Sequence, residues 1–249
     1  MQRLLAGVAD LIFPSRCATC DTLLRERDQP PFCPRCRAAI TAIASPLCPC
    51  CGLPFPVQEG EDHLCGECLV TPKPYDAMRA LGVYDGALLT AIHRFKYQGQ
   101  TNIGRILGGM MADTAVSLWS PGHFTLIVPV PLHKRRLRER GFNQAVVLAR
   151  EIARRLTLPL DVWSLRRAVE TIPQVDLARQ ERIHNVRGAF VLRRPERIVG
   201  QRILLIDDVC TTGSTLQECA SLLRRGKAKA VTALTVARAV MNLGKQVGN

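Results

Sequence analysis

The stretch RILLIDDVCTTGST, which runs from Arg202 to Thr215, decides the fold. Four apolar residues lead to Asp207 and Asp208, and a turn of threonine, glycine and serine follows at once. A nearly continuous apolar run of this length is typical of a strand that is buried on both faces of a parallel sheet. Two neighbouring carboxylates are costly to bury at the end of such a strand, which favours a functional role over an ordinary strand end.

The turn after the two aspartates has the features of a phosphate site. In a doubly wound sheet, ligands bind beyond the carboxyl ends of the strands, and the turn begins there. A glycine lets the backbone approach a ligand closely, and the N–H groups at the start of the following helix attract an anion. The candidate phosphate ligands are Thr211, Thr212, Gly213, Ser214 and Thr215.

Asp207 and Asp208 would repel a phosphate, so they need another role. Carboxylates accept hydrogen bonds from hydroxyl groups and help to hold Mg²⁺. A sugar that carries a 5′-phosphate and free 2′ and 3′ hydroxyls fits both the aspartates and the turn. The alternative is an ordinary strand followed by a capped helix.

The rest of the chain after Pro72 and Pro74 alternates between strand and helix patterns. This alternation, with apolar strands, predicts an α/β fold in which helices flank a parallel sheet. The expected strands are residues 78–85, 124–130, 188–192, 202–209 and 230–239, and the expected helices are 86–99, 101–119, 143–156 and 214–226.

The cysteines point to a small metal-bound unit at the N-terminus. Eight of the eleven form four Cys-x-x-Cys pairs before residue 70. Two such pairs complete a four-thiolate zinc shell, so the sequence predicts two structural zinc ions. Sequential pairing is the simplest arrangement, and a cross-braced one stays open. The predicted ligands are Cys17, Cys20, Cys33, Cys36, Cys48, Cys51, Cys65 and Cys68.

A disulfide framework is the competing explanation for these cysteines. It would need an oxidising compartment, and no secretory segment is visible. Residues 1–14 have apolar side chains at helical spacing, which predicts a short amphipathic helix and not a signal peptide. No apolar run reaches the ~18 residues of a membrane span. We therefore expect a cytoplasmic protein without membrane insertion. Cys50 is expected not to be a ligand, and His63 is expected to be an exposed loop residue, with a role as substitute ligand as the alternative.

Charge is unevenly distributed along the chain, whose formal net charge is +13. Residues 1–70 carry six basic and eight acidic side chains, so the positive charge belongs to the remainder. Such a field attracts phosphates, of a small molecule or of nucleic acid. The alternative is an arginine-rich surface that serves solubility alone.

Two further segments are rich in basic residues. Residues 128–145 place Lys134, Arg135, Arg136, Arg138 and Arg140 within seven positions, after a predicted strand. We expect a loop that holds a diphosphate, with a solvated basic face as the alternative. Residues 171–190 include Pro173, Gln174, Arg179 and Arg182, and they predict a flexible flap over the substrate.

The 202–215 stretch resembles the phosphoribosyl diphosphate signature of type I phosphoribosyltransferases. Together with the cysteine pairs and with the RGFNQ, NVRGAF and FKYQG motifs, the chain resembles the ComF family over residues 14–238. The resemblance implies a double zinc ribbon (1–70), a phosphoribosyltransferase-like domain (75–240) and a tail (241–249). It also implies a link to natural competence, in which single-stranded DNA enters the cytoplasm for recombination.

If the protein is an enzyme, the resemblance implies a phosphoribosyl transfer from phosphoribosyl diphosphate bound with Mg²⁺. Asp207 and Asp208 would hold the ribose hydroxyls, and Arg136 and Arg140 would stabilise the departing diphosphate. Further candidate substrate contacts are Leu132, His133 and Lys96. The acceptor, the turnover and the oligomeric state stay open.

The rival hypothesis is a non-catalytic module that binds a nucleotide or single-stranded DNA in the same pocket. Its zinc ribbon would dock a competence helicase or a recombination protein. Single-strand channels pair basic residues with aromatic ones, which directs attention to Phe95, Tyr97 and Phe142. We assign Trp119 and Trp163 to the core.

Overall fold

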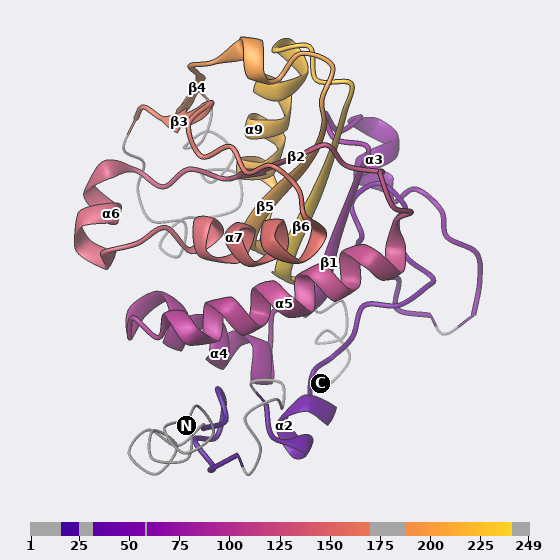
Figure 1. The fold of residues 1–249 in the computed structure, drawn as a ribbon. Coiled ribbons are helices and arrows are strands. Elements are labelled where there is room, and N and C mark those ends of the chain that lie inside the picture. The colour runs from indigo at the N-terminus through magenta and orange to yellow at the C-terminus, as the bar shows by residue number, and fades with distance from the viewer. Residues whose placement is uncertain (1–15, 25–31, 58, 170–187, 241–249) are drawn as a thin grey trace.

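The structure is a computed structural model that describes residues 16–24, 32–57, 59–169 and 188–240 (Figure 1). Three predicted segments lie wholly or mostly outside the described residues. They are the amphipathic helix over residues 1–14, residues 171–187 of the predicted flap, and the tail 241–249. Within the described part, no helix combines the length and the hydropathy that crossing a membrane would require.

The centre of the fold is a four-stranded parallel sheet with the strand order β1-β6-β5-β2. The strands are β1 (Ala77–Val83), β2 (Leu126–Pro129), β5 (Arg202–Cys210) and β6 (Ala230–Arg238). Pro129 at the end of β2 lies opposite Ile206 of β5. The segment after β2 therefore leaves the sheet at the edge where Asp207 and Asp208 emerge.

Helices cover both faces of this sheet (Figure 1). One face packs against α4 (Gly86–Tyr97), α5 (Thr101–Leu118) and α7 (Gln144–Leu156), and the other packs against α9 (Ser214–Arg225). Successive residues of β5 contribute to opposite cores, as side chains on a strand must. The predicted doubly wound α/β architecture is confirmed.

Two expectations about local structure were wrong. The segment 188–192 does not join the parallel sheet: β4 (Phe190–Leu192) pairs antiparallel with the short β3 (Leu165–Arg167). The basic stretch is not a loop but the helix α6 (Lys134–Arg140), which ends at Gly141 with φ 77°. Arginine has a high helix propensity, and the left-handed glycine supplies the helix stop.

Two aromatic residues were also assigned to the wrong surroundings. Trp163 is not in the core, since 53% of its surface is exposed. Phe95 cannot stack on a base, because it is fully buried and packs against Phe142 with ring centroids 5.5 Å apart. Trp119 is partly buried against the core, as expected.

The cysteine-rich segment packs along the open edge of β1. Its short helices are α2 (Pro34–Ala38) and α3 (Gly66–Val70). The 3-10 helix η2 (Pro195–Arg197) follows β4 and is not part of this segment. The N–H of Met78 donates to the carbonyl of Cys50 at 2.7 Å, and that of Val83 donates to Thr41 at 2.8 Å. These bonds cover an edge strand that would otherwise be exposed.

Gly104 on α5 is a sensitive packing position. A Cβ added there would lie 2.4 Å from ring carbons of Phe95, which is fully buried and cannot move aside. Alanine in a helix normally gains up to about 1 kcal/mol over glycine, whereas overpacking costs about 1–3 kcal/mol. We expect Gly104→Ala to lower the midpoint of thermal unfolding, measured by circular dichroism.

The exposed Asn102 on the same helix provides the control for this experiment. Asn102→Ala should leave the midpoint unchanged or raise it slightly, because only helix propensity changes. A midpoint for Gly104→Ala at or above that of the wild type would contradict the packing described here.

Candidate functional site

The two aspartates lie at the carboxyl end of β5, and Lys96 reaches them from the last turn of α4. The Lys96 Nζ atom lies 2.9 Å from Oδ1 of Asp208, with both side chains less than one-fifth exposed. Burial lowers the pKa of Lys96, but Asp208, with smaller contributions from Asp207 and Tyr84, outweighs burial and leaves that pKa above its ordinary value. Lys96 therefore stays charged and neutralises one of the two carboxylates.

Asp207 is the second carboxylate of the pair. Burial and the neighbouring Asp208 raise the pKa of Asp207 to about 7, although the Asp208 N–H donates to its Oδ1 at 2.9 Å. A hydroxyl donor or a cation would favour the ionised form of this group. Asp207 is thus poised to bind such a ligand near neutral pH.

The turn after β5 forms a hollow at the N-terminus of α9. Gly213 caps the helix with φ 77°, a conformation that favours glycine. The hydroxyls of Thr212 and Ser214 lie 2.8 Å apart, and the Ser214 N–H donates to Thr212 at 3.4 Å. Asp207 and residues 209–216 line the hollow. N–H groups and hydroxyls of this kind can bind a phosphate, and the phosphate site stays a prediction.

The helix α6 presents two of its arginines toward the protein. Arg136 and Arg140, one turn apart, are partly buried, whereas the other basic residues of α6 are exposed. The Arg140 guanidinium lies 5.0 Å from the ring centroid of Tyr97. His133, whose role was predicted as a substrate contact, caps α6 by accepting from the Arg135 N–H at 3.4 Å. Leu132, just before it, is partly buried.

Arg167 on β3 belongs to the same region, and no sequence pattern predicted this. Burial and the nearby Arg136 lower the pKa of Arg167, and Asp207 acts in the opposite direction. The Arg167 guanidinium also lies 5.3 Å from the ring centroid of Phe190. The strand that carries it has only three residues, too few for a periodic pattern.

A magnesium ion fits this donor set. Mg²⁺ is usually held by one or two carboxylates together with the phosphates of a substrate. Asp207 and Asp208 provide carboxylate oxygens at the end of β5, and Asp207 borders the hollow at the turn. The residues therefore match an ion that would be shared with a bound ligand.

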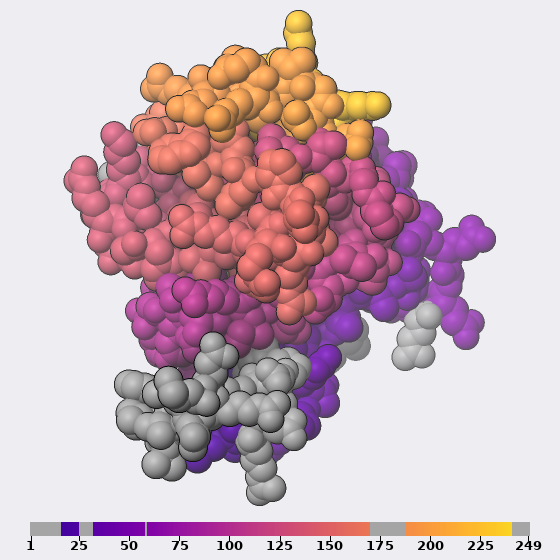
Figure 2. Space-filling view, viewed as in Figure 1, coloured from indigo at the N-terminus to yellow at the C-terminus, as the bar shows by residue number. Residues whose placement is uncertain are grey.

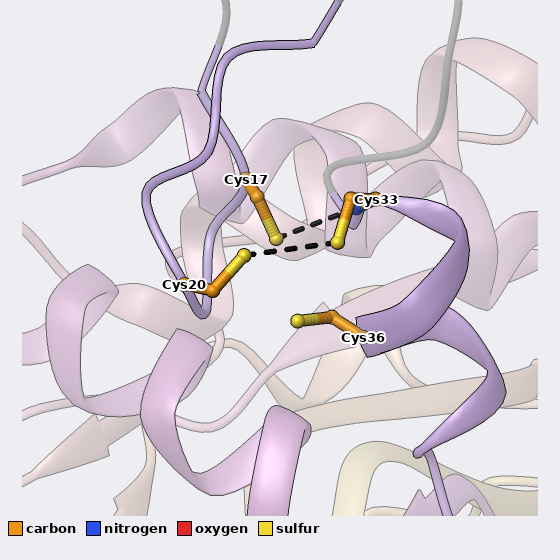
Figure 3. Close-up of side chains that lie close together, drawn as sticks. All are labelled: Cys17, Cys20, Cys33 and Cys36. Atoms are coloured by element: carbon orange, nitrogen blue, oxygen red, sulfur yellow. Dashed lines mark hydrogen bonds between the residues drawn. The ribbon is translucent and has the colours of Figure 1, made fainter.

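The eight paired cysteines form two four-sulfur clusters, and the pairing is sequential. One cluster holds Cys17, Cys20, Cys33 and Cys36 (Figure 3), and the other holds Cys48, Cys51, Cys65 and Cys68. All sulfurs of a cluster lie within 4.8 Å of one another. Two Sγ–Sγ distances, Cys20–Cys33 and Cys51–Cys65, are 3.7 Å. A tetrahedral zinc with Zn–S bonds of ~2.3 Å requires about 3.8 Å.

The clusters also need a cation on electrostatic grounds. Hydrogen bonding with Thr22 lowers the pKa of Cys20 to about 6, whereas burial and the adjacent thiols raise that of Cys36 to about 12. Four thiolates cannot share so small a volume without a compensating charge. His63 is not a ligand and stacks on Phe55 with ring centroids 4.0 Å apart. Cys50 lies outside both clusters.

The second cluster is connected through Arg238, at the end of β6, to residues 211–215, which we name the phosphate turn after the ligand predicted for it. The Arg238 guanidinium donates to Cys210 Sγ at 3.4 Å and to Cys51 Sγ at 3.6 Å. Cys210 is the residue directly before the turn, so the metal site supports the position of the turn. The Cys210 side chain is buried.

Metal content tests the two clusters separately. The purified wild type should contain two zinc ions per chain by inductively coupled plasma mass spectrometry. Cys36→Ser and Cys65→Ser should each reduce the content to one, because each removes a ligand from a different cluster. Cys50→Ser is the matched control and should keep two. A loss of both ions in either single-cluster variant would contradict independent sites.

The raised pKa of Asp207 predicts a pH-dependent cost to stability. A folded-state pKa of about 7, above the ordinary 3.8, means that stability is lost as pH rises from about 4 through 7. Asp207→Asn removes the ionisation and keeps an oxygen for the Asp208 N–H. The variant should therefore melt above the wild type at pH 8, with the difference shrinking toward pH 4. A difference independent of pH would contradict the shifted pKa.

The comparisons with known families divide the chain in two. A family model described as a double zinc ribbon domain matches residues 8–69, and one described as a phosphoribosyl transferase domain matches residues 143–243. Among solved structures, the chain is similar to the purine phosphoribosyltransferase from Pyrococcus horikoshii, with 13% identity and a TM-score of 0.34 over 61% of this chain and 93% of that one. At these values the structural likeness carries no argument on its own.

Three relatives are similar over most of their length. The DNA utilization protein YhgH of Escherichia coli (strain K12) is 35% identical over 80% of this chain and 87% of that protein. Competence protein F of Haemophilus influenzae is 33% identical, covering 84% and 90%. Competence protein ComFC of Bacillus subtilis (strain 168) is 32% identical over 83% of each chain.

Proposed function

The chain belongs to the ComF family, in which a double zinc ribbon precedes a phosphoribosyltransferase domain, and we propose that it binds phosphoribosyl diphosphate with Mg²⁺. The 5′-phosphate would bind residues 211–215, and the ribose hydroxyls would bind Asp207 and Asp208. The observation that carries this proposal is the acidic pair held beside the phosphate turn at the end of one strand.

The alignment of β2 with β5 supports a diphosphate position opposite the turn. Because Pro129 pairs with Ile206, the segment that leads to α6 emerges beside Asp207. Arg136 and Arg140 lie on the inward side of α6, and Arg167 adds a third guanidinium near Arg136. Guanidinium groups suit the oxygens of a diphosphate, which is the ligand that we expected for the basic residues of this segment.

Each residue then has a definite role in a transfer reaction. Residues 211–215 anchor the 5′-phosphate, so that binding energy remote from the reacting carbon positions the ribose. Asp207 and Asp208 accept hydrogen bonds from the ribose hydroxyls, and Lys96 holds Asp208 in place through their ion pair. Arg136 and Arg140 stabilise the negative charge that develops on the departing diphosphate. Asp207 and Asp208 would hold Mg²⁺, which would neutralise part of the negative charge of the bound ligand.

The names of the relatives suggest the setting in which this chemistry is used. One relative is described as a DNA utilization protein and two as competence proteins. We place this chain in the uptake and processing of single-stranded DNA. The acceptor would be a nitrogen nucleophile. The predicted flap at residues 173–182 lies outside the described residues.

A non-catalytic docking role is the second candidate. The helix α3 of the zinc lobe leaves Leu69 and Val70 exposed, at 65% and 84%. Exposed aliphatic residues on a metal-stabilised lobe favour contact with another protein. In this role the pocket would sense a nucleotide while the lobe binds a helicase or a recombination protein.

Calorimetric titration of the zinc-loaded protein with phosphoribosyl diphosphate tests the proposal. Binding should be strengthened by Mg²⁺ and lost in the Asp207→Asn/Asp208→Asn double variant. Gly213→Ala should weaken binding at least tenfold, because φ 77° strains a residue with a Cβ. Asp113→Asn, an exposed change on α5, is the control and should bind like the wild type.

The double variant separates the possible outcomes. Magnesium-dependent binding that the double variant loses would support the pocket. Binding that survives in the double variant, or no binding at millimolar ligand, would contradict the proposal and favour the docking role.

A further inference from the structure

A second site lies on the outer side of the β3–β4 hairpin. A hollow of about 350 Å³ is lined by Trp163, Arg166, Arg193 and Arg194. Trp163 is 53% exposed, and all three arginines are exposed. Within the described part of the chain, none of these three guanidinium groups has an acidic partner. A large aromatic face bordered by three cations is therefore open to a ligand.

The hollow is a built feature and not a chance grouping of surface side chains. Asp161, only 2% exposed, accepts hydrogen bonds from the Trp163 N–H at 2.7 Å and the Ser164 N–H at 3.0 Å. The Ser164 hydroxyl also donates to the Asp161 carboxylate. The buried carboxylate thus fixes the turn that presents the indole ring.

Further hydrogen bonds join this turn to the strand that carries the other arginines. The Arg193 N–H donates to the Ser164 carbonyl at 2.8 Å, and the Ser164 hydroxyl lies 3.3 Å from the Arg194 carbonyl. The tryptophan and the arginines therefore keep a fixed relation to one another. In Figure 2 the salmon and orange parts of the chain, to which they belong, form the upper part of the face in view.

This hollow does not belong to the ribose phosphate pocket. Arg166 and Arg167 are neighbours on β3, so their side chains leave opposite faces of the hairpin. Arg167 is partly buried and lies near Arg136 and Asp207, whereas Arg166 lines the outer hollow. One hairpin thus presents basic residues to two separate sites.

We propose that the outer hollow binds a single-stranded nucleic acid, with one base stacked on Trp163 and the adjacent phosphates bound by Arg166, Arg193 and Arg194. Every base has a face that can stack on an indole, and single-strand sites combine such stacking with basic groups that follow the backbone. A duplex would hide its bases, and an acidic peptide would bind the arginines without using the tryptophan face. The combination of both features selects a single strand.

This inference deepens the proposed role in DNA handling, and it rests on that role only for the choice of DNA as the first ligand. It does not depend on the ribose phosphate pocket, because the two sites share no residue. The two proposals can therefore fail separately.

The test uses the full-length, zinc-loaded protein and a fluorescein-labelled oligothymidylate of about 15 nucleotides, with binding followed by anisotropy. Trp163→Ala should weaken binding by about 5-fold to 150-fold, and Trp163→Phe should keep most of the affinity, because phenylalanine also stacks. Tryptophan emission should be quenched by the oligonucleotide in the wild type and not in Trp163→Phe, since Trp119 packs against the core.

The three arginines are tested with a charge-matched control. The triple variant Arg166→Gln/Arg193→Gln/Arg194→Gln should reduce the slope of log affinity against log salt by about 2, since three phosphate contacts release about 0.7 counterions each. The control Arg105→Gln/Arg150→Gln/Arg225→Gln removes three exposed arginines from other elements. It should change the slope by much less.

The result that supports the proposal is a loss of affinity in Trp163→Ala and in the outer triple variant, with Asp207→Asn/Asp208→Asn unaffected. Equal effects of the two triple variants, or an unchanged affinity in Trp163→Ala, would overturn it. Competition by poly-glutamate as effective as competition by unlabelled oligothymidylate would also overturn it, because it would assign the hollow to acidic peptides.

Discussion

The contact between Lys96 and Asp208 is the interaction on which the site depends. Two adjacent carboxylates at the end of a largely buried strand repel each other and lose hydration, so both cannot be ionised without compensation. Lys96 neutralises one carboxylate, and the other is left near its titration point at neutral pH. The packing of α4 makes this possible, because Phe95, the residue before Lys96, is fixed in the core against Gly104 of α5.

The remaining parts of the structure place further candidate ligand-binding residues around Asp207 and Asp208. The parallel register of β2 and β5 brings α6 to the same edge of the sheet, and the glycine cap of α9 shapes the turn for which we propose a bound phosphate. The zinc lobe covers the free edge of β1 and reaches the turn through Arg238, which contacts both Cys51 and Cys210. The metal clusters therefore contribute to the pocket as well as to the stability of the lobe.

Sequence patterns predicted the parts of the fold that have local signatures. The apolar strands, the long amphipathic helices and the regularly spaced cysteine pairs each follow from periodicity or spacing. The adjacent residues Asp207 and Asp208 indicated the candidate site. The expectation of a loop at α6 overlooked local signals, since its arginines favour a helix and Gly141 ends it. The other failures depended on tertiary placement: β3 has only three residues, and Trp163 carries no pattern that separates core from surface. Lys96 was predicted as a substrate contact, but its partnership with Asp208 joins residues 112 positions apart, which a single sequence does not reveal.

The most direct test of the central claim is a crystal structure of the protein grown with phosphoribosyl diphosphate and Mg²⁺. We expect ribose hydroxyls within hydrogen-bonding distance of Asp207 and Asp208, the 5′-phosphate on the N–H groups of residues 211–215, and Lys96 still paired with Asp208. A ligand bound elsewhere, or a phosphate turn left empty beside an occupied α6, would contradict the claim that the acidic pair and the turn form one ribose phosphate pocket.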